Sequence, residues 1–339
     1  MKPVRMGIIG LGLWGQAHAR IIASHPSSEL VAVCDLDESK ASAVGAQYNV
    51  PHFTDYKALL RSDTIDAISI VTPDFAHTEF AVAAAEAGKH VLIEKPLATK
   101  TKECELIIRA MEKNKVRIMV DFHNRWNPPF ASAKETIAAG QLGDLVSAYF
   151  RLTDVISVPT KMLSWSAKSS ILWFLGSHTV DTLRWLFKDE VKRVFAVSRS
   201  GILKAQGIDV ADVYQAILEF RQGGIATIEN NWIVPNTQPF VNDFKFNMLG
   251  SKGMISIDLS NNQAYERFLE NQADHPDIFV KPVIHGKPMG FAHESIRSFI
   301  DCLAGDVPFV VDAYDGLEVT KVIEAIILSA ETREPVLVS

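Results

Sequence analysis

The sequence has few cysteines, no long apolar run and no excess of positive charge. Cys34, Cys104 and Cys302 stand alone, without a CxxC pair or a histidine at ligand spacing, so we expect no disulfide framework and no metal site. No apolar run approaches the roughly 20 residues that cross a bilayer. The net charge of −6 offers no attraction to nucleic acid or to an anionic membrane. These absences predict a cytoplasmic protein with neither kind of partner.

The composition is that of a soluble globular enzyme. Hydrophobic residues make up 47% of the chain and charged residues 22%. A length of 339 residues favours two domains over one. The first apolar run contains glycine, so we expect it to be a strand rather than a signal peptide.

The first 35 residues carry the most informative motif. An apolar run (residues 6–9) meets a glycine turn (10–15), and a helix-compatible segment (16–24) follows. A second apolar run (30–34) ends at Asp35. Strand, glycine turn, helix, strand and acid in this order form the dinucleotide-binding fingerprint in its required context. A glycine turn alone would equally suit an ordinary strand-to-helix connection.

Each residue of the turn has a physical task in binding a dinucleotide. Gly10 allows the tight turn, Gly12 lets the backbone approach a pyrophosphate, and Gly15 allows close packing of helix and strand. Leu13 and Trp14 lie between these glycines at the start of the helix, whose free N–H groups face the phosphates. We therefore expect all five residues to contact the cofactor.

Asp35 bears on which cofactor is bound. It lies 20 residues after Gly15, where a carboxylate can accept hydrogen bonds from both hydroxyls of the adenosine ribose. The same carboxylate repels a 2′-phosphate, and no arginine occurs in residues 36–39. NAD is therefore favoured over NADP. Lys40 is the one nearby residue that would favour NADP, through the positive charge of its ammonium.

Hydrophobic periodicity divides the chain into residues 1–122 and 123–339. The first part alternates strands and helices, which predicts an α/β domain with a doubly wound parallel sheet. The second part has a run of strands between residues 145 and 258, joined by short turns and flanked by helices. That order predicts an α+β domain with a mostly antiparallel sheet. Residues 124–129 mark the crossover.

Polar residues follow two neighbouring strands of the predicted parallel sheet, where ligands of such sheets bind. Thr72, Pro73 and His77 come after one strand and are expected near the nicotinamide half of the cofactor. Glu94 and Lys95 come after the next, directly before a proline that restricts Lys95 to an extended conformation. A lysine at this place can hold a substrate hydroxyl, whereas most lysines are simply solvated.

A second candidate site lies in residues 173–181. On a helix, His178, Asp181 and Trp185 share one face. A lone helical histidine is more often structural than catalytic, so His178 gains weight only from the rest of the pattern.

Taken together, these motifs resemble the glucose-fructose oxidoreductase/inositol dehydrogenase (Gfo/Idh/MocA) family from end to end. The resemblance is carried by the glycine turn, Asp35, residues 71–77, Glu94-Lys95-Pro96, residues 124–129, residues 176–181 and the C-terminal segment 313–336. It implies an NAD(P)-dependent oxidoreductase with an N-terminal Rossmann domain and a C-terminal α+β domain on a large open sheet. It also implies a homodimer or homotetramer formed through that sheet.

The resemblance assigns roles to the candidate residues. Lys95 would orient a sugar or cyclitol substrate, and His178 would be the acid/base. Family members often carry an aspartate four residues before this histidine, where this chain has Phe174. Asp181 and Asp154 are possible replacements for that carboxylate.

Further residues are weaker candidates for contacts to the sugar. For each of them, packing or an oligomer contact is an equal alternative: Asn124, Arg125, Trp165 and His293.

Two other functions remain open. Some relatives hold NAD tightly and cleave a glycosidic bond through transient oxidation. Others are regulators that keep the NAD site and bind a partner protein, a role that Phe174 would suit and that Lys95 and His178 count against. The sequence favours the dehydrogenase.

Overall fold

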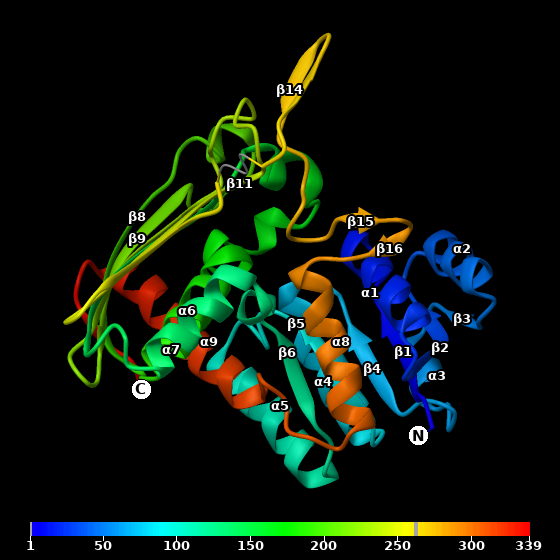
Figure 1. Cartoon of the computed structure of the whole chain (residues 1–339). Coiled ribbons are helices and arrows are strands. Elements are labelled where there is room, and N and C mark those ends of the chain that lie inside the picture. The colour runs from blue at the N-terminus through cyan, green and yellow to red at the C-terminus, as the bar shows by residue number, and fades with distance from the viewer. Residues whose placement is uncertain (1, 261–263) are drawn as a thin grey trace. The chain divides into compact units, whose positions relative to one another are not determined.

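Two units make up the computed structural model of this chain, which describes residues 2–260 and 264–339 (Figure 1). The first unit comprises Met1–Trp126 and Phe279–Leu317, and the second comprises Asn127–Ile278 and Glu318–Ser339. Among the described residues, no helix combines the length and the apolar composition that crossing a membrane requires.

The first unit is built on a six-stranded parallel sheet in the order β3-β2-β1-β4-β5-β6. This confirms the predicted doubly wound sheet, with the change of winding direction between β1 and β4. The strands are β1 (Val4–Ile9), β2 (Ser28–Cys34), β3 (His52–Phe53), β4 (Ala67–Ile70), β5 (His90–Glu94) and β6 (Ile118–Asp121). The helices are α1 (Leu13–Ser24), α2 (Glu38–Tyr48), α3 (Tyr56–Leu60), α4 (His77–Glu86), α5 (Thr101–Asn114) and α8 (Phe291–Ala304).

A late segment of the chain packs with this first unit. Residues 279–317, which the sequence analysis placed in the second domain, carry the short strands β15 (Val283–Ile284) and β16 (Lys287–Pro288) and helix α8. Helix α8 lies against α1, β1 and β6, and it buries Ile296, Phe299 and Ile300. The apolar face of α8 therefore completes the core of the first unit.

The second unit is built on a seven-stranded sheet in the order β12-β11-β7-β10-β9-β8-β17. Strands β7 and β10 pair in parallel and the other neighbours are antiparallel, which confirms the predicted mostly antiparallel sheet. The strands are β7 (Leu145–Asp154), β8 (Val191–Arg199), β9 (Val213–Phe220), β10 (Ile225–Asn231), β11 (Asn242–Gly250), β12 (Met254–Asp258) and β17 (Val336–Leu337). A separate hairpin joins β13 (Arg267–Leu269) and β14 (Gln272–Asp274).

Helices cover one face of this sheet (Figure 1). They are α6 (Pro128–Ala138), α7 (Ser177–Phe187) and the part of α9 (Ala313–Thr332) that belongs to the second unit. On the covered face, Phe130 of α6 packs its ring against Phe150, Phe244 and Phe246. These buried rings form the core of the second unit.

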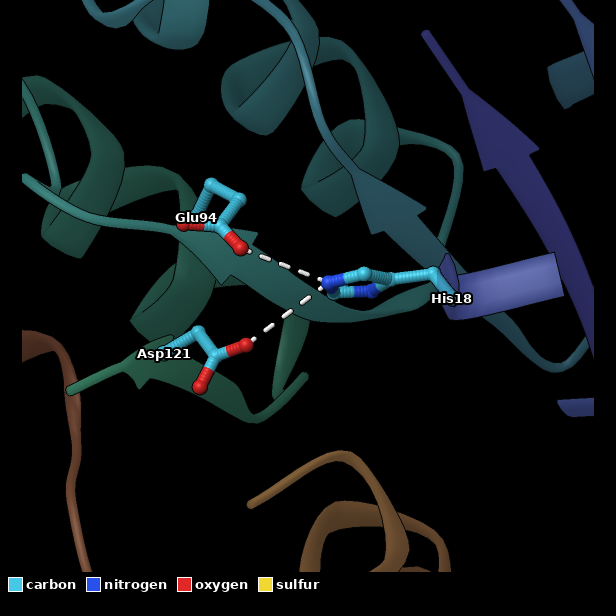
Figure 2. A group of neighbouring side chains, drawn as sticks. All are labelled: His18, Glu94 and Asp121. Atoms are coloured by element: carbon cyan, nitrogen blue, oxygen red, sulfur yellow. Dashed lines mark hydrogen bonds and ion pairs between the residues drawn. The ribbon is translucent and has the colours of Figure 1, made fainter. Parts of the chain in front are cut away.

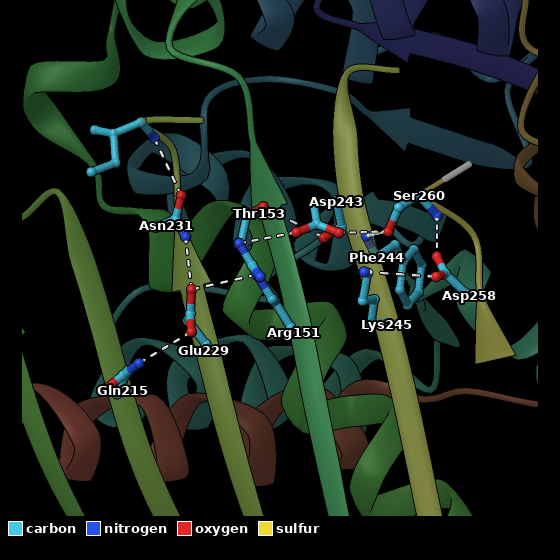
Figure 3. Close-up of polar contacts among 11 residues, drawn as sticks. Arg151, Thr153, Gln215, Glu229, Asn231, Asp243, Phe244, Lys245, Asp258 and Ser260 are labelled. Carbon is cyan, nitrogen blue, oxygen red and sulfur yellow. Dashed lines mark hydrogen bonds and ion pairs between the residues drawn. The ribbon is translucent and has the colours of Figure 1, made fainter. Parts of the chain in front are cut away.

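The opposite face of the sheet is open within this unit. Phe195, Ile217 and Ile225 each expose two-fifths or more of their surface on β8, β9 and β10. Further along this face, Arg151 of β7 lies 3.5 Å from Glu229 and 3.0 Å from Asp243, on the strands to either side (Figure 3). The charged side chains of the open face thus pair with one another, whereas its apolar side chains stay exposed within the unit.

Candidate cofactor and active site

The glycine turn has the shape that a bound pyrophosphate requires. Gly10 has a φ of +96°, and a Cβ there would lie 2.4 Å from the carbonyl oxygen of Val71. A Cβ on Gly15 would lie 2.0 Å from the carbonyl oxygen of Gly10, so this close approach also requires glycine. Gly12 caps α1 without a side-chain hydrogen bond and faces open space. The N–H groups at the start of α1 are therefore accessible to a phosphate.

The carboxylate of Asp35 is held beside this turn. Its Oδ2 accepts a hydrogen bond from the backbone N–H of Leu11 (2.7 Å), and its Oδ1 accepts one from Asp37 (2.9 Å). These bonds fix the carboxylate at the end of β2. Lys40 pairs with Asp37 at 3.3 Å, so its charge is balanced by a neighbouring acid. Both observations fit NAD in preference to NADP.

The two neighbouring residues of the turn present apolar surface. Leu13 is 63% exposed. The indole of Trp14 stacks on the imidazole of His123, with ring centroids 5.9 Å apart, and the ammonium of Lys281 lies 4.8 Å from the indole centroid. Trp14 is thus held by a residue that follows β6 and by one that precedes β15, rather than being free in solution.

His77 ties together the loops that follow β4 and β5. Its Nδ1 lies 2.6 Å from the carbonyl oxygen of Pro96, and its Nε2 lies 3.0 Å from that of Thr72. Burial lowers the pKa of His77, and the two carbonyl oxygens oppose that shift. Since both ring nitrogens face the backbone, we expect His77 to position Thr72, Pro73 and Lys95 rather than to contact a cofactor itself.

Glu94 and Lys95 differ in burial. The peptide bond between Lys95 and Pro96 is cis. The side chain of Glu94 is buried and lies 3.3 Å from His18 of α1. The side chain of Lys95 is only partly buried. Of these two residues, Lys95 is thus the more accessible one.

In the second unit, His178 follows a π-helical turn. Residues Leu172–Gly176 form this turn and continue directly into α7, an arrangement that is frequent at functional sites. His178 lies in the first turn of α7 and is 5% exposed. Phe174 lies in the π-helical turn and packs against Trp165, with ring centroids 6.1 Å apart and the planes at 69°. A histidine and two aromatic rings therefore belong to this region of the unit.

Asn230, which the sequence analysis did not single out, holds the start of α7 against the sheet. Its Nδ2 donates to the carbonyl oxygen of Leu152 (2.9 Å) and to the hydroxyl of Thr179 (3.0 Å). Thr179 follows His178 directly. The alternation of residues along a strand does not show that the amide of Asn230 is buried against a helix. The sequence analysis therefore could not single out Asn230.

The carboxylates considered as replacements at Phe174 are both buried. Asp181 is 0% exposed on α7, and Asp154 is 2% exposed at the end of β7. Asp154 accepts a hydrogen bond from the amide of Asn242. The structure thus places them in the interior of the unit.

The weaker candidates differ in their surroundings. Arg125 donates to the carbonyl oxygen of Val310 (3.0 Å) and pairs with Asp315 (3.0 Å), which supports its packing role. His293 is 2% exposed, and its Nδ1 lies 2.7 Å from the carbonyl oxygen of Met289. Asn124 is 3% exposed.

Two further polar residues of the first unit escaped the sequence analysis. His18 lies on the buried side of α1, and Asp121 ends β6 in the way that Asp35 follows β2. Both lie close to Glu94, as described below. The sequence offered two signals for them: His18 lies three residues after Gly15, and Asp121 lies at the end of a strand.

Comparison with known proteins agrees with this geometry. Residues 4–122 match the GFO/IDH/MocA oxidoreductase family with an NAD-binding Rossmann fold, and residues 130–256 match the GFO/IDH/MocA C-terminal domain.

Individual relatives match four-fifths or more of the chain. Inositol 2-dehydrogenase 1 of Saccharopolyspora erythraea is 26% identical over 98% of this chain and 96% of its own length. Levoglucosan dehydrogenase of Pseudarthrobacter phenanthrenivorans is 28% identical over 81% of this chain and 78% of its own.

Solved structures share the fold. The crystal structure of scyllo-inositol dehydrogenase from Lactobacillus casei, with bound NAD(H) and scyllo-inositol, superposes with a TM-score of 0.83 at 20% identity, covering 99% of both chains. The glycine turn, the placement of Asp35 and both domain matches lead to one conclusion: this chain belongs to the GFO/IDH/MocA family of NAD-binding oxidoreductases.

Proposed function

We propose that this protein is an NAD-dependent dehydrogenase that acts on a secondary hydroxyl of a sugar, a cyclitol or a derivative of one. The observation that carries the proposal is the open glycine turn with Asp35 beside it, in the same unit as the Glu94-Lys95-Pro96 segment. Relatives named for inositol and for levoglucosan, a glucose anhydride, support the substrate class.

The residues present fit NAD. Gly10, Gly12 and Gly15 with the start of α1 would hold the pyrophosphate, and Asp35 the adenosine ribose. When bound, NAD supplies the nicotinamide carbon that accepts or donates a hydride. Lys95 would hold the substrate hydroxyl through its ammonium. His178 would take the proton of that hydroxyl during oxidation, or supply it during reduction.

A substrate panel tests this function. Cyclitols, hexoses and their deoxy and anhydro derivatives are incubated with NAD or NADP, and the absorbance of the reduced cofactor is followed. We expect reduction of NAD with at least one member. Product that forms without reduced cofactor would point to the glycosidase alternative. No product with any member, despite NAD binding, would point to the regulator.

Asp35 is expected to set the cofactor preference. Its carboxylate can pair with a 2′-hydroxyl but opposes a 2′-phosphate, so NAD should bind at least ~tenfold more tightly than NADP, about 1.4 kcal/mol. The variant Asp35→Ser should narrow that gap. Titration of both cofactors by calorimetry measures it, and Asp63→Ser, which removes an exposed acid before β4 in the same unit, is the matched control. Equal affinity of the unsubstituted protein for NAD and NADP would contradict this role.

We also propose that the open face of the second unit's sheet packs against a second copy of the chain, giving a homodimer or homotetramer. Phe195 and Ile217 are direct cross-strand neighbours on this face, exposed by 40% and 48%. Ile225 adds 48% exposure on β10. A contiguous apolar surface of this kind is typical of a protein interface.

Charge placed on this face should separate the copies. The variant Ile217→Lys would bury an unpaired ammonium in the interface, so we expect its mass in solution to fall to that of a monomer. Analytical ultracentrifugation measures this. Leu106→Lys is the matched control, because Leu106 is 49% exposed on α5, in the other unit. A monomeric unsubstituted protein, or an Ile217→Lys variant of unchanged mass, would refute the interface.

We further infer that the protein works in a reducing compartment such as the cytoplasm. All three cysteines are buried, and none of them forms a disulfide bond. Burial, with the charge of Asp35, raises the pKa of Cys34 to about 12. The thiol of Cys34 therefore stays protonated and unreactive.

A further inference from the structure

Three ionisable side chains from separate elements of the first unit meet beside the segment that carries Lys95 (Figure 2). His18 comes from α1, Glu94 ends β5 and Asp121 ends β6. The Nε2 of His18 lies 3.3 Å from Oε1 of Glu94 and 3.7 Å from Oδ2 of Asp121. Its Nδ1 lies 2.8 Å from the hydroxyl of Ser69. All four residues are buried, so water does not screen their interactions.

Two carboxylates that face one imidazole in a buried place must share protons, because uncompensated buried charge is costly. Burial raises the pKa of Asp121 to about 7, and the charge of Glu94 adds to this rise. Burial also acts to raise the pKa of Glu94, but the hydrogen bond and charge of His18, together with the charge of Lys95, lower it to about 2. Glu94 is therefore the anion of the cluster, and Asp121 holds its proton up to about neutral pH.

Other polar groups surround this cluster. Ser295 of α8 acts to lower the pKa of Asp121, against the effect of burial. Burial lowers the pKa of His123 to about 4, and burial also lowers the pKa of His293. Neither of these imidazoles carries a positive charge at neutral pH. The Glu94 carboxylate is therefore stabilised mainly by its hydrogen bond with His18 and by the charge of Lys95.

We propose that His18 is a positioning residue for Lys95 and acts through its hydrogen bond to Glu94. Glu94 directly precedes Lys95, and Pro96 directly follows Lys95. The carbonyl oxygen of Pro96 is held by His77 of α4. The segment Glu94-Lys95-Pro96 is thus held by hydrogen bonds from α1 at Glu94 and from α4 at Pro96. Since α1 also begins with the glycine turn, His18 links the cofactor helix to the lysine. The inference rests on the proposed function, in which Lys95 holds the substrate.

Removal of the imidazole has a definite electrostatic consequence. The hydrogen bond that His18 directs at the Glu94 carboxylate disappears. Lys95 then becomes the main cation for the Glu94 carboxylate. An opposite charge that is no longer shared favours the protonated amine, so the pKa of Lys95 should rise. The ammonium should also be drawn toward Glu94 and away from a substrate.

The first experiment measures Lys95 without any substrate. The full chain is treated with an amine-selective reagent at a fixed, mildly alkaline pH, and modification of Lys95 is followed by peptide mass spectrometry. We expect His18→Leu to slow modification at least ~threefold, because the reagent attacks only the neutral amine. His18→Gln should lie in between, since an amide can still donate to Glu94. His25→Gln is the matched control, because His25 caps the other end of α1 and pairs with exposed Asp301.

The second experiment measures turnover on the substrate found with the panel. His18→Leu should lower kcat about tenfold and shift the pH profile of kcat, while the Kd for NAD stays within about twofold. His18→Gln should recover part of the loss. If the unsubstituted protein reduces no NAD, the proposed function fails, yet the modification experiment still decides the link between His18 and Lys95.

Three results would overturn the proposal. One is an unchanged rate of Lys95 modification in both His18 variants. Another is a loss of kcat that only follows the folded fraction, with no shift of the pH profile. The third concerns metal, because the donor atoms of His18, Glu94 and Asp121 lie within 4.8 Å of one another. Elemental analysis that finds one equivalent of a divalent metal, lost in His18→Gln, would make the cluster a metal site. If His18→Leu does not fold, His18→Gln decides.

Discussion

His178→Ala and Lys95→Ala are each expected to lower turnover at least ~100-fold, the usual range for removal of a general acid/base being about 10²–10⁴. His178 would lose proton transfer, and Lys95 would lose the charge that holds the hydroxyl. The affinity for NAD should change little, because the glycine turn and Asp35 are intact. Stopped-flow or steady-state turnover and NAD titration on the same preparations measure both effects.

Conservative variants separate chemistry from packing. His178 is buried in α7, so His178→Gln, which keeps most of the volume, guards against simple loss of structure. Lys100→Ala and His52→Ala are matched controls, because both remove exposed side chains of the same types. Turnover of His178→Ala close to that of the unsubstituted protein would remove His178 from the mechanism. Loss of NAD affinity along with turnover would show that the substitution acted on the fold.

The first unit could be predicted from the sequence because its signals are local. The strands of its sheet are short apolar runs, and the helices between them begin and end at recognisable residues. Gly15 is required by its close approach to the carbonyl oxygen of Gly10 in the same turn, and Gly10 by its positive φ. When each local preference agrees with the global fold, a pattern of this kind specifies the topology.

The return of residues 279–317 to the first unit was not predictable in the same way. The periodicity of α8 shows that the helix has an apolar face, but not which surface covers it. Only the folded chain places Ile296, Phe299 and Ile300 in the core of the first unit. Long-range packing of this type leaves no mark on the local sequence.

Only those residues of the site that have a local signal in the sequence were predicted. Asp35 and Lys95 lie where a strand ends, a position that the sequence reveals. His18 and Asp121 matter through contacts between elements far apart in the chain, at 3.7 Å in the folded unit. The sequence also did not show that the guanidinium of Arg125 pairs with Asp315.

Phe174 presents a different kind of question, because it departs from the pattern of the family. The ring is partly exposed in the π-helical turn before α7 and lies edge-on to Trp165. Two adjoining aromatic rings make an apolar surface on which the C–H face of a pyranose can stack. A ring at this place cannot accept a hydrogen bond from a hydroxyl, as the aspartate common in the family would. We therefore propose that the substrate has one free hydroxyl fewer near the reacting carbon: a deoxy, anhydro or substituted sugar.

Phe174→Asp is accordingly expected to reverse the substrate preference. A hydroxyl left without a partner at an apolar site costs about 1–3 kcal/mol, a factor of about 5 to 150 in kcat/KM. The variant should gain on myo-inositol and glucose and lose on deoxy and anhydro analogues. Phe174→Leu is the matched control, because it stays apolar and removes only the stacking ring, so it should weaken turnover without a change of preference. If the unsubstituted enzyme turns over myo-inositol or glucose as well as any analogue, Phe174 does not select the substrate. Its contact with Trp165 would then serve only to pack the turn that precedes His178.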